Sequence, residues 1–489
     1  MPRQQSPDDR FDFRGGLNTS FSDDTVDASE FVSALNMRLN DEYGGLVKRA
    51  QTRKVHSDQL GAGAKVLGIH QWENPSGNKE LVAICGGTFY HKEQGDTTFT
   101  SEAGSLSTTE RCRFEEHRDG ATIVLYIAQG SSVYKWGTTF ATSVATAPDA
   151  LDLKLYKGRL FGIEDTKRLH YTAVTAPEGW GDFADVETFD TDPLVALALT
   201  GSSLALLKGD TIARFTGNDQ NTIEIDRESE GISPMAGCVA RHTAVEVEAF
   251  FFFLSDRGPH LGTEAGVQYI GDKLEGVMKD DWQWSKVPAM ALAVYNRGRK
   301  AIMLGVPEGA SAVGADTFYE YSMVANAWAG KWVFPFEVCS IARYENADGS
   351  ETVVGGGDDG YVRILDYRAS ATRLDDVSVA GVGGSAIAGD FQPGTLLFGT
   401  SRNYKSLGGE QVLSCDLGAG GALYIDWENE FGDTGTLGPI ASAGAGMHQY
   451  RFRSKARGAR LTLTFREETD AAWRFYGLSL VGTVGSEEV

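Results

Sequence analysis

Leu204-Ala-Leu-Leu-Lys-Gly-Asp-Thr-Ile-Ala-Arg-Phe215 predicts two strands joined by a tight turn. Its apolar residues alternate on either side of a Gly-Asp pair, and a two-residue period around a glycine reversal is typical of a β-hairpin. Ile123-Val-Leu-Tyr-Ile-Ala-Gln-Gly-Ser-Ser-Val-Tyr-Lys-Trp136 repeats the pattern. Similar segments fill the chain from about Val66 to Tyr367. Many consecutive hairpins indicate a sandwich, a barrel or a propeller.

The spacing of the reversals favours a propeller. Gly86 and Gly130 are 44 residues apart, and Gly158 and Gly201 are 43 apart, which matches the roughly 40–45 residues of a four-stranded propeller blade. The 302 residues of the hairpin series would hold about seven such blades. Because Gly130 and Gly158 are only 28 residues apart, six to eight blades remain open. We therefore predict an all-β chain built on a β-propeller.

The flanking segments differ from this series. Residues 1–50 predict an N-terminal extension of short strands and a hairpin, and residues 51–368 the propeller. Residues 369–389 are small, polar and rich in glycine, which predicts a linker or a mobile edge. At least five alternating segments in residues 390–489 predict a β-sandwich. The best helix candidate, Asp272 to Asp281, places Leu274, Val277 and Met278 on one face.

Composition restricts the function. The chain has 489 residues and a net charge of -22, which argues against a surface that wraps nucleic acid, since such surfaces need clustered lysine and arginine. An acidic surface would instead let DNA pass without adhering, although solubility alone also explains it. The sequence shows no apolar signal segment and no run of about 18 apolar residues. We expect no membrane span, and assembly in a cytosol.

The cysteines carry no metal-binding or redox pattern. They are dispersed, with no CxxC pair and no histidine at metal-ligand spacing. An odd, scattered set of this kind predicts reduced thiols that are buried as small apolar groups. The five are Cys85, Cys112, Cys238, Cys339 and Cys415.

Motifs for catalysis or cofactor binding are missing from the sequence. No P-loop, HExxH, GxSxG or EF-hand loop occurs. Glu115 and Glu116 could serve a glycosidase, but neighbours on a strand point to opposite faces and make a poor acid/base pair. Asp190-Thr-Asp192 could bind Ca²⁺, although without a third spaced carboxylate a turn is the simpler interpretation. Gly418-Ala-Gly-Gly421 lies between strands, which predicts a loop and not a phosphate cradle.

Further candidates have structural alternatives. His242 and His260 flank a phenylalanine-rich strand and could meet in space, but isolated histidines in a β protein are usually structural. Ser255-Asp-Arg-Gly258 is faintly similar to a sialidase Asp-box, without the aromatic residue expected after its glycine. Four tryptophans could stack on sugars, although packing in the blades is the simpler interpretation. These are Trp180, Trp282, Trp284 and Trp328. We therefore predict no catalytic, cofactor or metal site residues and no cofactor.

Several phrases together resemble one family. Phe13-Arg-Gly-Gly-Leu-Asn18, Asn36-Met-Arg38 and Gly45-Leu-Val-Lys-Arg49 are similar to the start of tail nozzle (tail tubular) and tail-stabilisation proteins of short-tailed bacteriophages. Further likenesses follow along the chain, so the resemblance touches most of it through short, degenerate motifs. They are Arg168-Leu-His-Tyr171 before Pro177-Glu-Gly-Trp180, Leu206 to Gly217, Gly231-Ile-Ser233, Phe251 to Gly258, and Trp473 to Leu480. Pro259 departs from the family pattern, which tends to carry an aromatic strand residue there.

The resemblance implies a structural virion protein. Members of the family form a ring, usually of six copies, around the DNA exit channel, and contact other tail proteins such as adaptor and fibres. We therefore expect a tail nozzle or hub subunit with no enzymatic activity, assembled in the host cytoplasm and located in the virion tail. Genomic DNA would pass without specific binding. Two alternatives remain: a glycan-binding propeller, acting as a receptor-binding tail component or a lectin, and a propeller hydrolase.

Overall fold

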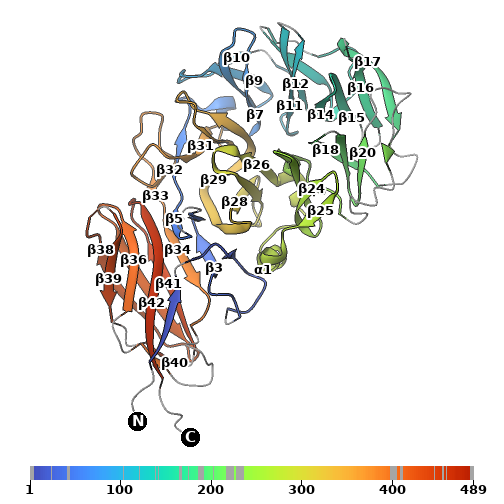
Figure 1. The fold of residues 1–489 in the computed structure, drawn as a ribbon. Coiled ribbons are helices and arrows are strands. Elements are labelled where there is room, and N and C mark those ends of the chain that lie inside the picture. The colour runs from blue at the N-terminus through green and yellow to red at the C-terminus, as the bar shows by residue number, and fades with distance from the viewer. Residues whose placement is uncertain are drawn as a thin grey trace.

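The computed structural model confirms an all-β chain (Figure 1). Helices in the described chain are short: η1 (Leu60–Gly63), η3 (Arg241–Thr243), η4 (Asp272–Leu274), α1 (Glu275–Asp280), α2 (Val287–Met290) and η5 (Arg297–Arg299). The structure describes all residues except 1–4, 11, 24, 41–43, 103, 120–121, 138, 141–142, 165–167, 175, 186–191, 202, 216–224, 227–235, 397–404, 408–410, 445, 454–455, 459 and 485–489. None of the helices in the described part could span a membrane.

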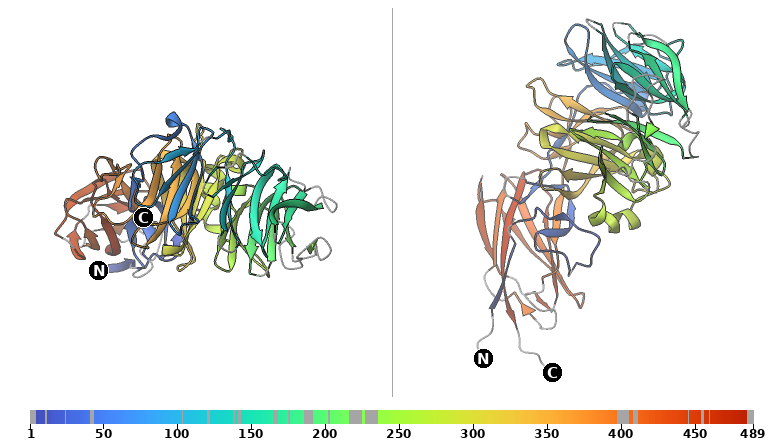
Figure 2. Two further views of the ribbon diagram at one scale, coloured as in Figure 1. Left: turned by 90° about the horizontal axis from the view of Figure 1, so that it is seen from above. Right: turned by 45° about the vertical axis from the view of Figure 1, so that its right-hand side comes forward.

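Five small antiparallel sheets follow one another in chain order and form the first blades of a β-propeller (Figures 1 and 2). In each, the first strand lies innermost and short turns lead outward. The five blades are β7–β10 (Val66–Glu73, Lys79–Cys85, Thr88–Glu93, Thr100–Glu102), β11–β13 (Arg113–Asp119, Thr122–Ala128, Val133–Trp136), β14–β17 (Ala150–Tyr156, Arg159–Glu164, Arg168–Ala173, Ala176–Asp185), β18–β21 (Leu194–Thr200, Ser203–Lys208, Ile212–Phe215, Ile225–Asp226) and β22–β25 (Val245–Val247, Phe250–Ser255, Gly258–Thr263, Gly266–Tyr269).

The last two blades share one long strand. The first part of β29 (Ala327–Glu345) completes the sheet of β26 (Leu292–Asn296), β27 (Ala301–Val306) and β28 (Ala315–Ser322). Its second part begins the next sheet with β30 (Glu351–Gly357) and β31 (Val362–Tyr367). The outermost strand there is β6 (Gln51–Lys54), which comes from the start of the chain and closes the propeller. The described sheets thus make seven blades.

Two layers of strands form a β-sandwich beside the propeller, at the lower left of Figure 1. Phe391 and Phe475 meet between these sheets with ring centroids 4.4 Å apart. One sheet contains β3 (Glu30–Leu35), β34 (Gly389–Pro393), β41 (Leu461–Glu467), β37 (Ala422–Asn429) and β38 (Thr434–Ala441). The other contains β39 (His448–Phe452), β36 (Gln411–Leu417), β42 (Trp473–Val484), β35 (Lys405–Ser406), β40 (Arg457–Gly458), β1 (Gln5–Arg10), β4 (Met37–Leu39) and β5 (Leu46–Lys48).

The N-terminal strands join the two bodies. β2 (Gly16–Leu17) runs parallel to β3, and β3 pairs with β29 on one side and with β34 on the other. Blades six and seven and one of the two sandwich sheets therefore belong to one continuous 13-stranded sheet. A single apolar cluster likewise includes Phe13, Trp328 and Trp473. Residues expected as an extension thus form the connection between propeller and sandwich.

The structure also describes the predicted linker, the predicted helix and the cysteines. The segment expected as a linker contains the paired strands β32 (Leu374–Asp375) and β33 (Ser385–Ala386), and Asp375 is only 5% exposed. It is therefore an ordered part of the junction because its acidic residues meet buried cations there. The expected helix is confirmed as η4 and α1, with Leu274 and Met278 buried. All five cysteines are free and buried, as predicted.

Candidate functional site

The glycines of the N-terminal motifs lie where backbones from different bodies meet. Gly16 has a φ of +79°, and a Cβ there would lie 2.5 Å from the carbonyl oxygen of Trp328 in β29. A Cβ on Gly45 would lie 2.2 Å from the carbonyl oxygen of Phe475 in β42. Any side chain would collide with these carbonyls, so glycine permits the close approach. The motif thus sets contacts to the propeller on one side and to the sandwich on the other.

Asn36 holds the turn between β3 and β4. It adopts a φ of +54°, a conformation that asparagine tolerates better than most residues. Its side-chain oxygen accepts hydrogen bonds from Arg49 Nε at 2.8 Å and from the Val333 N–H at 3.0 Å. Its amide nitrogen donates to the Ala388 carbonyl at 2.8 Å. One side chain therefore connects the N-terminal segment, blade six and the start of the sandwich.

Two buried cations complete this junction. The Arg49 side chain is fully buried and donates from both terminal nitrogens to the carboxylate of Asp375, with one bond of 2.8 Å. It also stacks on the Phe334 ring, 4.6 Å from the centroid. Lys48 Nζ lies 2.6 Å from Glu467 Oε2, and both side chains are fully buried. Burial lowers the pKa of Lys48, and the charge of Glu467 opposes that shift.

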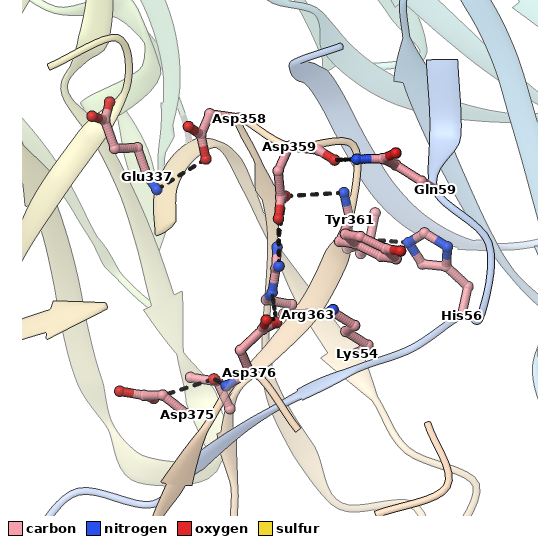
Figure 3. A network of polar contacts seen from close by, with 12 residues as sticks. Lys54, His56, Gln59, Glu337, Asp358, Asp359, Tyr361, Arg363, Asp375 and Asp376 are labelled. Atoms are coloured by element: carbon pink, nitrogen blue, oxygen red, sulfur yellow. Dashed lines mark hydrogen bonds and ion pairs between the residues drawn. The ribbon is translucent and has the colours of Figure 1, made fainter. Parts of the chain in front are cut away.

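The closing blade carries a second network, drawn in Figure 3, which adjoins the junction. Arg363 donates two hydrogen bonds to Asp359, at 2.9 and 2.6 Å, and a third to Asp376 at 2.7 Å. Lys54, in the closing strand β6, lies 3.4 Å from Asp376 and 3.9 Å from the centroid of the Tyr361 ring. Because Asp376 follows Asp375 in the chain, the blade closure and the junction share one acidic turn.

His56 reinforces the closure next to β6. Its Nε2 accepts a hydrogen bond from the Val362 N–H at 2.8 Å, so this nitrogen carries no proton. The ring also packs against Tyr361, with centroids 5.4 Å apart (Figure 3). Burial lowers the pKa of His56 to about 4, and the hydrogen bond with the Asp58 carbonyl opposes the shift. The closure therefore requires neutral histidine.

A cavity of about 380 Å³ lies in the centre of the propeller, with residues from the inner edge of every blade in its wall. This cavity is the propeller channel, and at one level along its axis the charged side chains form ion pairs. Lys154 Nζ lies 3.2 Å from Glu115 and 2.9 Å from Glu246. Glu116 pairs with His70 at 3.1 Å. Burial raises the pKa of Glu115, and the charge of Lys154 opposes that shift.

The other level, near the starts of the inner strands, is cationic. Arg111, Arg113 and His242 line the cavity there. Arg241 lies next to them, since its carbonyl accepts a hydrogen bond from Arg113 and its side chain donates to the Val195 carbonyl. Burial lowers the pKa of His242 far below its usual value, and the three arginines lower it further. Asp152 is the carboxylate that forms an ion pair with this group, at 3.2 Å from Arg113 Nε. The channel is thus electrostatically uneven.

The carboxylates that were candidate site residues in the sequence have ion-pair or hydrogen-bond partners wherever the structure describes them. Glu115 and Glu116 both line the channel, but each is paired with cations, as described above. Asp192 accepts hydrogen bonds from the backbone N–H groups of Asp210 and Thr211, which makes it part of a turn. Asp190 and Thr191 lie outside the described residues, as do Gly231 to Ser233. The described residues contain no group of three or more potential metal ligands.

The aromatic and histidine candidates are mostly structural. His260 is buried, stacks on Phe253 and bonds the Gly258 carbonyl, whereas His242 faces the channel. Ser255 Oγ donates to the Gly258 carbonyl and closes the β23–β24 turn. Gly418 to Gly421 forms the predicted loop between β36 and β37. Trp180 is buried between blades, whereas Trp282, Trp284 and Trp328 belong to or pack against the apolar cluster that joins propeller and sandwich.

Sequence reasoning missed the channel cations. Arg111, Arg113, Arg241 and His242 come from blades two and five, and no local motif joins them. Their only signal is position: both basic pairs, 111/113 and 241/242, stand at or just before the first strand of a predicted blade. Because inner strands of all blades converge on one axis, basic residues at their starts must approach each other.

In the comparisons with known proteins, this chain is similar to solved structures and matches nothing else. No family model matches the chain, and no curated protein matches its sequence. A structure of BBS1N in complex with ARL6DN has a TM-score of 0.43 at 14% identity and covers 66% of this chain and 99% of that chain. The mitotic checkpoint complex scores 0.41 at 9% identity, covering 65% and 96%. The N-terminal domain of Nup159 scores 0.41 at 11% identity, covering 68% and 97%. These likenesses concern the fold and carry no function.

Proposed function

We propose that this chain is a structural virion protein: a tail nozzle or hub subunit that forms a ring around the DNA exit channel of a short-tailed bacteriophage. The observation that carries the proposal is the role of the motif residues. Gly16, Asn36, Gly45, Lys48 and Arg49 carry the resemblance to tail nozzle proteins. Gly16, Asn36 and Arg49 lie at the junction of propeller and sandwich, and Gly45 and Lys48 fix the same segment to the sandwich. A subunit that must hold neighbours in a ring needs this kind of stiff internal connection.

The architecture and charge agree with such a role. β38 and β39 end their sheets in the described chain, so their outer edges offer backbone groups to neighbouring subunits. Closed rings bury such edges in repeated, heterologous contacts. The net charge of -22 disfavours adhesion of DNA to the surface. Adaptor and fibre proteins would be the further partners in the tail.

The mass of the purified full-length protein tests this proposal. Mass photometry should give the mass of a closed oligomer, with six copies the expected number, and negative-stain images should show a ring. Antibodies raised against the chain should label one end of the phage particle. Gel shift at about 0.15 M salt should show no retention of double-stranded DNA, since the acidic surface repels phosphate. A stable monomer at micromolar concentration that is also missing from particles would contradict the proposal.

A further inference from the structure

The cationic level of the propeller channel has a hydrogen-bonding pattern that charge pairing does not explain. Arg111 donates to two neutral acceptors, the carbonyls of Met290 at 2.7 Å and Ala291 at 3.1 Å. Arg241 donates from Nε to the Val195 carbonyl at 2.9 Å. These bonds fix the guanidinium groups in place, but neutral carbonyls do not balance their charge.

The histidine of this level has unused hydrogen-bonding capacity. Within the described part of the chain, neither ring nitrogen of His242 has a hydrogen-bond partner, although the residue lines the cavity. Arg113 donates to the carbonyls of Arg241 and Ala244. Its buried Nε has no hydrogen-bond partner and lies 3.2 Å from Asp152. The Asp152 oxygens in turn accept from the N–H groups of Leu153 and Leu197.

The charges of this level are therefore unequal. Three arginines act on His242 by their charge and disfavour its protonation, and of these only Arg113 forms an ion pair with a carboxylate, that of Asp152. Leaving cations uncompensated in a confined site is unfavourable, and an anion with several acceptor oxygens would remove that cost. We propose that the cationic level of the propeller channel binds a small oxyanion of the phosphate or sulfate class. The Arg111 and His242 side chains, which line the cavity, would supply the donors beside Arg113, and Arg241 would add positive charge close to His242.

The cavity suits such an occupant. Its volume of about 380 Å³ exceeds the space of an oxyanion and leaves room for several waters at about 30 Å³ each. The opposite level, where Lys154 lies between Glu115 and Glu246, already has its charges matched and offers no second anion site. This site lies inside a single propeller, so the inference does not depend on the proposed ring.

Isothermal titration calorimetry on the full-length protein tests the proposal. Sodium phosphate and sodium sulfate are titrated separately into protein in chloride buffer at constant ionic strength, and one saturable site per chain is expected. Adenosine 5′-monophosphate forms a third arm: binding of free phosphate alone indicates an inorganic ion, and tighter binding of the ester indicates a phosphorylated metabolite. Heat without saturation in all three arms overturns the proposal.

Variants locate the site. Arg241→Gln should weaken phosphate binding about tenfold or more, because it removes a positive charge close to His242, and His242→Leu should weaken it about three- to tenfold. Arg297→Gln is the matched control, since it removes one charge from a 64% exposed side chain at the far level of the same cavity. It should leave binding unchanged. Circular dichroism establishes folding, and if Arg241→Gln does not fold, His242→Leu decides. Unchanged phosphate affinity in the folded Arg241→Gln and His242→Leu variants overturns the proposal.

Discussion

The junction and the propeller channel both confine arginine side chains, but they give them different partners. At the junction Arg49 meets the carboxylate of Asp375 through two hydrogen bonds, and the neighbouring closure gives Arg363 two carboxylates. In and beside the channel, Arg111 and Arg241 are held by backbone carbonyls. The first arrangement pairs each cation with a carboxylate, and the second holds the cations by neutral acceptors.

This difference separates structural from binding roles. A buried ion pair adds little over an apolar pair, but removing one partner is strongly destabilising, so such pairs fix one geometry. The pairs at the junction therefore specify how the propeller sits on the sandwich. Cations without matched carboxylates specify no partner within the chain, and they remain available to an external anion. Three experiments test this distinction.

Removing the junction cation should have the largest effect. Arg49→Met leaves Asp375 buried without its partner, and we expect the free energy of unfolding to fall by about 3–5 kcal/mol. Urea denaturation followed by tryptophan fluorescence measures the change. Arg297→Gln is the control because Arg297 is 64% exposed and 3.9 Å from Glu351, and its effect should stay within about 0.5 kcal/mol. If the free energy of unfolding fell by the same small amount in Arg49→Met and Arg297→Gln, the junction ion pair would have no special structural role.

The close approach at the junction should have the next largest effect. Gly16 and Gly349 share a φ of +79°, but a Cβ on Gly349 would meet no atom within 4 Å. Alanine at either position carries the left-handed strain of about 1–2 kcal/mol. Gly16→Ala adds the collision with the Trp328 carbonyl, which we expect to cost about 1–3 kcal/mol more. Thermal unfolding of the two variants measures this difference, and identical losses would mean that the contact with β29 is not needed.

The closure should show a smaller, pH-dependent effect. The pKa of His56 is about 4 in the folded chain, against 6.5 for a free histidine, so folding favours the neutral form. The stability that neutral His56 adds to the folded chain is fully present above pH 6.5 and is lost as the pH falls toward 4. At pH 5 the loss should be about 2 kcal/mol relative to pH 7.5. His56→Gln should have a correspondingly flatter pH profile in urea denaturation. The same slope in variant and wild type would exclude His56 as the source.

Local patterns in the sequence were sufficient for most of the propeller. The hairpin predicted from Leu204 to Phe215 is β19 and β20, and the one from Ile123 to Trp136 is β12 and β13. Alternation and a turn glycine lie within a dozen residues, so these elements are visible without a partner. The helix at Asp272 was visible for the same reason. Spacing of the reversals gave about seven blades, and seven are formed in the described chain.

Contacts between distant segments were not visible in the same way. Arg49 and Asp375 are 326 residues apart, and nothing near Asp375 signals a buried partner in a segment that is small, polar and rich in glycine. The sequence also did not predict that β29 serves two blades, because nothing within its 19 residues marks a strand shared between two sheets. The channel cations share no motif, since only the radial arrangement of the blades brings them together. The tail role remains a prediction.

The closing strand β6 has a consequence for biosynthesis. His56, next to β6, accepts its hydrogen bond from a residue 306 positions further along the chain, and Arg10 in β1 pairs with Leu478 in β42. On the ribosome, these early segments emerge long before their partners and must stay unpaired while six blades form. Completion of the ring and of the sandwich is thus a late event, which gives nascent chains a long window in which a chaperone or a sister chain can capture them.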